Sequence, residues 1–246
     1  MKLLVIGDSC IDIFRYGEVD RLAPEAPIPV VRPVQEIRNS GMAGNVVANL
    51  KALGADVDFV TNKQEIRKIR YICSKYNHPL LRVDENDTCD RIEIENVLTN
   101  IQWDVYDAII ISDYCKGFLH EDDIEYISQS HPHTFLDTKR ILGHWANNIS
   151  YIKINYQEYI NNKEVLESEV HLFERSIITR GKFGCDYNHK NYPTVNVPVK
   201  DVSGAGDTFL SGLVFKYVTT KDIETAIKFA QECTTIVVQK EGVATI

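Results

Sequence analysis

The sequence lacks both a paired cysteine pattern and a long apolar run. Its six cysteines form no Cys-x-x-Cys pair, so a disulfide framework of the kind found in small secreted chains is not expected. No apolar stretch approaches the length of a membrane span, and the apolar run after Met1 is too short for a signal sequence. We therefore expect a reduced, cytoplasmic protein with no membrane partner.

Positive charge is also in deficit. Lys and Arg total 27 against 35 for Asp and Glu, which gives a formal net charge of -8. General nucleic-acid binding depends on phosphate neutralisation by Lys and Arg, so this function is not expected. A local anion site remains open. The basic run at residues 63–70 interleaves Ile66 and Ile69 and predicts an amphipathic surface segment rather than a nucleic-acid patch.

The 246 residues have ordinary globular composition, with 44% hydrophobic and 25% charged residues. Short apolar runs alternate along the chain with helical patterns. The runs lie at residues 3–6, 57–60, 108–111, 151–154 and 177–178, and the helical patterns at 46–53, 121–127, 209–218 and 222–239. This alternation predicts one α/β domain, residues 1–246, with a mostly parallel central sheet flanked by helices.

Two segments depart from that pattern. Residues 15–38 contain four prolines, which are confined to edge strands and turns, and residues 67–83 alternate apolar and polar side chains around a turn at 77–79. These segments are interpreted as one small β-flap or lid, at about residues 14–38 and 67–84. Exposed strand edges in such a flap are usually covered, so we expect a homodimer in which two flaps pair.

The strongest local signal for chemistry is the stretch Gly204-Ala205-Gly206-Asp207 at the start of a predicted helix. Backbone N–H groups at a helix start, next to small residues, favour an anion. Asp207 would lie beside that anion, where a carboxylate can accept a proton from an attacking hydroxyl. The alternative is a glycine turn in which Asp207 only complements the helix dipole.

Four motifs follow one another along the chain: the stretch from Gly41 through Asn45 to Gly54, Asn155-x-x-Glu158, Thr179-x-Gly181-x-x-Gly184, and Gly204-Ala205-Gly206-Asp207. In this order they resemble the motifs of the ribokinase-like (PfkB) carbohydrate kinases. The resemblance implies a ribokinase-like fold and ATP as phosphoryl donor. It further implies Mg²⁺, with a monovalent cation as an additional candidate.

The resemblance also assigns roles to residues. Asp207 is the expected base, the amides of Gly204, Ala205 and Gly206 bind the transferred phosphoryl group, and Thr179, Gly181 and Gly184 contact the nucleotide. Asn155 and Glu158 are expected at Mg²⁺ through water, although a helix cap explains the same spacing. The residues expected on the sugar side are Asp8, Asp12, Gly41, Asn45, Asp113 and Lys116. Turn and cap chemistry is the alternative for Asp8 and Asp12, and lone surface charges for Asp113 and Lys116.

A narrower resemblance joins the chain to the kinase domain of ADP-heptose synthesis enzymes. It rests on stretches such as residues 7–12, 21–31, 80–84, 112–117 and 137–139. It implies phosphorylation of D-glycero-D-manno-heptose 7-phosphate at its anomeric hydroxyl, in a route to lipopolysaccharide-type glycans. Another carbohydrate kinase, or a catalytically silent relative that binds nucleotide or sugar phosphate, is the alternative.

The chain departs from this family at Met42 and after Asn62. Met42 occupies the position of the motif's second glycine, where a side chain could crowd the sugar. After Asn62 a helix and strand present in relatives are missing. A sugar 7-phosphate needs a cationic pocket, for which Arg21, Arg38, Lys68 and Arg70 are candidates.

Overall fold

The computed structural model describes all of residues 1–246, and its centre is an eight-stranded sheet. In spatial order its strands are β12 (Lys190–Tyr192), β11 (Cys185–Tyr187), β10 (Ser176–Thr179), β9 (Tyr151–Asn155), β8 (Thr134–Thr138), β7 (Ala108–Asp113), β1 (Lys2–Gly7) and β4 (Asp56–Val60). The six strands from β10 to β4 are parallel, and β11 and β12 add an antiparallel hairpin at one edge. The predicted α/β fold with a mostly parallel sheet is confirmed.

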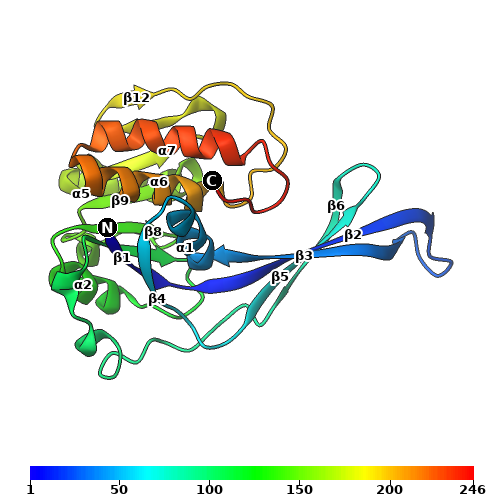
Figure 1. Cartoon of the computed structure of the whole chain (residues 1–246), viewed down its shortest axis with the longest axis horizontal. Helices are drawn as coiled ribbons and strands as arrows, with labels where there is room; N and C mark the ends of the chain where they lie inside the picture. The colour runs from blue at the N-terminus through cyan, green and yellow to red at the C-terminus, as the bar shows by residue number, and fades with distance from the viewer.

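Helices cover both faces of this sheet (Figure 1). One face packs against α1 (Ala43–Ala52), α6 (Ala205–Thr220) and α7 (Ile223–Val237). The other face carries α2 (Glu121–Ser130), α3 (Tyr156–Asn161), α4 (Lys163–Ser168) and α5 (Val170–Glu174). Short 3-10 turns lie at Leu98–Asn100, Trp103–Val105, His144–Ala146 and Gly181–Phe183.

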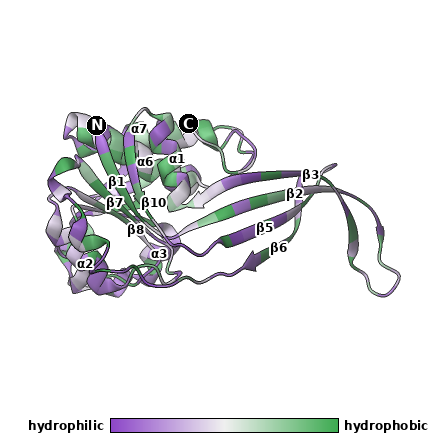
Figure 2. Cartoon of the chain, turned by 60° about the horizontal axis from the view of Figure 1, so that its bottom comes forward, coloured by the Kyte–Doolittle hydropathy of each residue, from purple (hydrophilic) through white to green (hydrophobic).

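The two helical layers explain why the strands are continuous apolar runs. In β1, Leu3 and Val5 enter the core under α1 and α6, whereas Leu4 and Ile6 enter the core on the opposite face. A strand buried on both faces cannot alternate apolar with polar residues. The apolar colouring along β1 and β7 contrasts with the mixed colouring of the second sheet (Figure 2).

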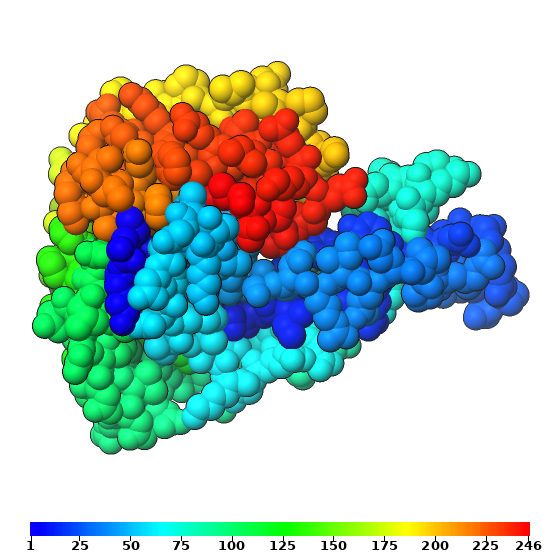
Figure 3. All heavy atoms as spheres, in the orientation of Figure 1, coloured from blue at the N-terminus to red at the C-terminus, as the bar shows by residue number.

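The second sheet, which we call the arm, projects from the body of the molecule (Figure 3). Its strand order is β3 (Pro29–Met42), β2 (Ser9–Leu22), β5 (Ile66–Cys73) and β6 (His78–Glu85). Both long strands have 14 residues, and β2 pairs antiparallel with β3 and parallel with β5. The prolines at 29, 33 and 79 lie on the edge strands β3 and β6, as the missing N–H of proline requires.

The structure differs from the sequence-based expectation in a few elements. The turn before β6 ends at Asn77, so Pro79 lies in the strand and not in a turn. Strand β8 was not among the predicted runs, because its two apolar residues, Phe135 and Leu136, are flanked by polar ones. The hairpin of β11 and β12 also carries too few apolar residues to signal a strand. No helix in the chain combines the length and the apolarity that crossing a membrane would require.

Candidate active site

The backbone of the loop before α6 passes close to the side chain of Asn45. Gly204 has φ +77°, and a Cβ there would lie 2.5 Å from the Asn45 amide nitrogen, so this position requires glycine. Asp201 fixes the loop by accepting hydrogen bonds from the N–H groups of Ser203 and Gly242, at 2.8 and 3.2 Å. The N–H of Ala205 donates to the Val202 carbonyl at 3.1 Å. The amides of Gly206 and Asp207 lie in the first helical turn, where α-helices supply no backbone acceptor.

Asp207 lies buried at this helix start, with 4% of its surface exposed. The hydroxyl of Tyr114 donates to Asp207 Oδ1 at 2.6 Å, and Asn45 Nδ2 donates to Oδ2 at 2.9 Å. Burial raises the pKa of Asp207 to about 6, while these two hydrogen bonds act in the opposite direction. The carboxylate is therefore ionised at neutral pH and close enough to titration to accept a proton.

A cavity of about 180 Å³ opens beside Asp207, between the arm and the body. It is lined by Cys10, Asp12, Met42, Lys68, Arg70, Arg82, Tyr114, Ser203, Gly204, Asp207 and Val243. Most of these side chains come from β2, β5 and β6 of the arm and from the loops that follow β7 and precede α6. We call this space the acceptor cavity.

Lys68 is the least compensated charge in the acceptor cavity. It is 9% exposed and makes no hydrogen bond or ion pair, and burial lowers its pKa. The other two cations are paired, Arg70 with Asp12 and Arg82 with Asp84. The sequence placed residues 63–70 on a surface, and for Lys68 this was wrong, because alternation along β5 turns its side chain inward while Arg67 stays exposed.

A second space, of about 110 Å³, lies on the other side of the α6 N-terminal turn. It gathers Thr179, Gly181, Gly184, Thr194, Ala205, Gly206, Phe209, Gln231 and Thr234. All three residues expected at the nucleotide from the Thr-x-Gly-x-x-Gly motif are here, so we call it the donor pocket. The first turn of α6 thus separates the two pockets, with Gly206 facing one and Asp207 the other.

Four charged side chains lie beneath the α6 loop. Lys153 is 3% exposed and pairs with Asp137 at 2.7 Å, and a Cβ on Gly206 would lie 2.8 Å from its ammonium. Lys139 pairs with Glu158. Burial opposes the ionisation of Asp137, but Lys153 and Lys139 outweigh it and lower its pKa. Nothing in the sequence pointed to Lys153, because an isolated lysine in a strand carries no spacing signal. Lys139 stood in the stretch 137–139 without a role of its own.

Asn155 and Glu158 form a capping box at the start of α3. The Asn155 side chain accepts from Glu158 N at 2.9 Å, and Glu158 Oε2 accepts from Asn155 N at 2.7 Å. Glu158 Oε1 accepts from Asn155 Nδ2 at 2.7 Å and also pairs with Lys139. The helix-cap alternative therefore describes this pair as it stands in the structure. The Glu158 carboxylate keeps lone pairs that these contacts do not use, so it can also accept from a water of a hydrated Mg²⁺.

The residues predicted on the sugar side separate into two groups. Asp12 lines the acceptor cavity, Gly41 lies against Asp12, and Asn45 reaches the cavity through Asp207. The other group does not line the cavity and stabilises the loop after β7 instead.

That second group comprises Asp8, Asp113 and Lys116. Asp8 is fully buried and accepts the N–H groups of Tyr114 and Phe118 at 2.6 and 3.3 Å. Asp113 pairs with Arg140, and Lys116 with Asp87. The alternative of turn chemistry does not describe Asp8, because the N–H groups that it accepts lie 106 and 110 residues further along the chain. The surface-charge alternative does not describe Asp113, which is fully buried.

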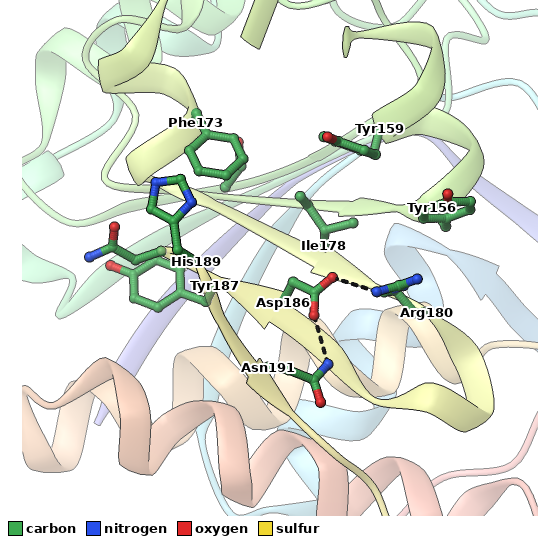
Figure 4. A pocket seen from close by; sticks show the side chains of 11 residues that line it. Tyr156, Tyr159, Phe173, Ile178, Arg180, Asp186, Tyr187, His189 and Asn191 are labelled. Carbon is green, nitrogen blue, oxygen red and sulfur yellow. Dashed lines mark hydrogen bonds and ion pairs between the residues drawn. The ribbon is translucent and has the colours of Figure 1, made fainter. Parts of the chain in front are cut away.

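The largest cavity, about 420 Å³, lies elsewhere, on the face of β10–β12 that α3 and α5 border (Figure 4). Its rim is aromatic, with Tyr156, Tyr159 and Phe173. Its charged groups are satisfied among themselves, because Asp186 accepts from both Arg180 and Asn191, at 2.9 and 2.7 Å. It contains none of the predicted site residues and no unpaired cation, so it is a poor phosphate site.

Comparison with known proteins agrees with this geometry. The model of the family described as "pfkB family carbohydrate kinase" matches residues 143–246. This part of the chain holds the donor pocket, the α6 loop and Asp207. The recognition of a PfkB-type chain is thus confirmed, and the findings together support a carbohydrate kinase.

Relatives extend the similarity to the whole chain. The "Bifunctional protein HldE" of Nitratiruptor sp. is 31% identical over 99% of this chain and 63% of its own length. The protein of the same name from Sulfurimonas denitrificans is 30% identical over 100% of this chain and 62% of its own length. This chain therefore spans somewhat less than two thirds of these relatives. The first alignment runs over 294 residues, which is longer than this chain, so the relative has residues that are absent here.

Solved structures show the same fold at low identity. Phosphofructokinase-2 from Escherichia coli has a TM-score of 0.72 at 13% identity, covering 98% of this chain and 93% of that one. Ribokinase from Thermotoga maritima has a TM-score of 0.70 at 14% identity, covering 98% and 94%. The ribokinase-like fold predicted from the motifs is confirmed.

Proposed function

We propose that this chain transfers the γ-phosphoryl group of ATP to the anomeric hydroxyl of D-glycero-D-manno-heptose 7-phosphate. The proposal rests on the heptose-kinase motifs in the sequence and on the pfkB match. The product would be the 1,7-bisphosphate, a precursor for nucleotide-activated heptose. Six free cysteines and an ATP requirement are compatible with the cytoplasm as the site of action.

One observation supports a sugar phosphate rather than a neutral sugar as the acceptor. The acceptor cavity holds a carboxylate suited to a base, Asp207, and a buried cation without a counterion, Lys68. The ammonium of Lys68 makes no hydrogen bond or ion pair, so it is available to bind an anion. A neutral sugar would leave it without a direct partner, whereas a sugar phosphate supplies one. Of the four candidate cations from the sequence, Lys68 and Arg70 line the cavity, and Arg21 and Arg38 do not.

The reaction uses groups on both sides of the α6 turn. The sugar hydroxyl oxygen forms a bond to the γ-phosphorus, the bond from phosphorus to the β,γ-bridging oxygen breaks, and ADP leaves. Asp207 accepts the hydroxyl proton. The amides of Gly206 and Asp207 and the ammonium of Lys153 beneath them stabilise the charge on the transferred group, whereas the amide of Ala205 is already bonded to Val202. Mg²⁺, when bound with ATP, would neutralise the phosphates near Asn155 and Glu158.

The direct test measures ADP production by the full chain with ATP, Mg²⁺ and a panel of sugars. The panel contains heptose 7-phosphate, the unphosphorylated heptose, fructose 6-phosphate and ribose. The highest kcat/KM is expected with heptose 7-phosphate. Folded protein that binds ATP and turns over none of these sugars would contradict the proposal and favour a silent binding protein.

Replacing the unpaired cation tests the substrate class. Lys68→Met should raise KM for heptose 7-phosphate by roughly tenfold or more, since a charge-assisted contact contributes about 1.5–3 kcal/mol. The KM for ATP should change little, because Lys68 does not line the donor pocket. Arg67→Met is the matched control, since its side chain lies on the exposed side of the same strand. An equal effect of both variants on KM would remove Lys68 from phosphate binding.

A further inference from the structure

Tyr114 makes the shortest hydrogen bond to Asp207, and no motif assigned it a role. Its hydroxyl donates to Asp207 Oδ1 at 2.6 Å, from the loop between β7 and α2. It also lines the acceptor cavity. We propose that Tyr114 is a positioning residue that holds the Asp207 carboxylate ionised and oriented toward the sugar hydroxyl. This inference rests on the proposed function, in which Asp207 is the base.

The loop holds Tyr114 firmly in place. The buried carboxylate of Asp8 accepts the backbone N–H of Tyr114 at 2.6 Å, and that of Phe118 at 3.3 Å. The ammonium of Lys139 lies 5.1 Å from the Tyr114 ring centre, on the side of the Glu158 network. The buried Asp8 thus acts through the loop, because its hydrogen bonds determine where the Tyr114 hydroxyl points.

The hydrogen bond from Tyr114 affects the protonation of Asp207 because this carboxylate is buried. Burial raises the pKa of Asp207 to about 6, and the hydrogen bond from Tyr114 lowers it more than any other contact does. The other groups that face Asp207 are Asn45 on α1, Cys10 on β2, Asp137 on β8, Lys139 just after β8, and Lys153 on β9. Asn45 Nδ2 already donates to Asp207 Oδ2.

Tyr114 also stays a donor throughout the working pH range. Burial, and then the charge of Asp207, raise the pKa of the phenol well above its ordinary value. Its hydroxyl makes no other hydrogen bond, so removing it takes away one donor to Asp207 and nothing else. The remaining carboxylate contact, from Asn45, cannot replace it on Oδ1.

The test is the pH profile of Tyr114→Phe. Loss of one hydrogen bond to a charged group should raise the apparent pKa of the acid limb by about one to two units. Turnover by the variant should therefore approach that of the unchanged protein at pH 8.5 and fall roughly tenfold below it at pH 6.5. Tyr106→Phe is the matched control, because it also loses a 2.8 Å bond to an aspartate, Asp58, away from the site.

Two outcomes would overturn the inference. One is a Tyr114→Phe defect of the same factor at every pH, which would indicate a packing role. The other is an unchanged pKa of Asp207 in Tyr114→Phe. This pKa is measured without turnover, from the infrared band of the protonated carboxyl group, which is assigned by its loss in Asp207→Asn. We expect the pKa to be higher in Tyr114→Phe than in the unchanged protein. A shifted band in a protein that phosphorylates no sugar would leave the Tyr114 contact intact and contradict only the proposed function.

Discussion

At the residue scale, two features of Asp207 change its pKa in opposite directions. Its burial favours the neutral acid, and its hydrogen bonds with Tyr114 and Asn45 favour the carboxylate. The outcome is a pKa of about 6, which lies close to the pH at which a general base is most effective. A base that must be ionised loses activity as the pH falls through its pKa, so turnover should decline below about pH 6.

Removing the carboxylate tests the base directly. Asp207→Asn should lower kcat by roughly 100- to 10,000-fold, the usual contribution of a positioned general base. The affinity for ATP, measured by calorimetry, should stay within about threefold, because Asp207 faces the acceptor cavity and not the donor pocket. Retention of more than a tenth of kcat would exclude Asp207 as the base.

Met42 is a second residue whose position matters. Its φ of +55° with ψ of −133° is a backbone conformation that glycine adopts readily and methionine does not. Its side chain is 4% exposed and lines the acceptor cavity with Cys10. A methionine in place of the motif's second glycine therefore narrows the acceptor cavity at the cost of a strained backbone.

At the scale of secondary-structure elements, the strands β8 and β9 are joined by a buried ion pair. Asp137 and Lys153 are opposite each other in register and pair at 2.7 Å, both nearly inaccessible to solvent. Lys153 thereby stands beneath the first turn of α6. The position of Lys153 under the α6 turn therefore depends on β8 and β9 being neighbours in the sheet.

Breaking this pair should destabilise the fold. Lys153→Met leaves Asp137 buried without its nearest counterion and should cost about 3 kcal/mol of unfolding free energy, which is roughly 6–12 °C in Tm. Lys153→Met combined with Asp137→Leu should recover a large part of the loss, because no unpaired carboxylate then remains.

Calorimetric or circular-dichroism melting measures both variants. Lys190→Met is the control, because the pair of Lys190 with Glu224 is exposed and its loss should leave Tm unchanged. If Lys153→Met melted like the control, the buried pair would have no structural role.

At the scale of the whole molecule, the arm projects from the body and carries several exposed apolar side chains. Leu22, Ile28 and Val34 are each more than half exposed, and they lie in or between β2 and β3. Prolines in β3 interrupt its free edge, which disfavours strand-to-strand pairing there. We therefore propose that two arms pack through their faces in a homodimer.

The oligomeric state tests this arrangement. Light scattering or sedimentation should give twice the 28.0 kDa of one chain. Val34→Asp places a charge in the proposed interface and should shift the mass toward one chain, while far-ultraviolet circular dichroism stays unchanged. A single-chain mass for the unchanged protein at micromolar concentration would contradict the homodimer.

The sequence by itself determined the fold class and the order of the motifs. Continuous apolar runs such as Leu3 to Ile6 predicted strands buried on both faces, and the glycines around Ala205 predicted an anion site at a helix start. These features are local, because an apolar run and a pair of glycines at a helix start can both be recognised within a few neighbouring residues. The grouping of Thr179, Gly181 and Gly184 beside Gly206 followed from the resemblance.

Only the tertiary structure decided which charges meet. Lys68 points into the acceptor cavity because β5 pairs with β2 in a particular register, and the sequence cannot reveal that register. Tyr114 and Asp207 are 93 residues apart, and a loop held by Asp8 brings them together. Contacts of this kind depend on strand order and loop anchoring, so the surroundings of the base were fixed by packing and not by any pattern along the chain.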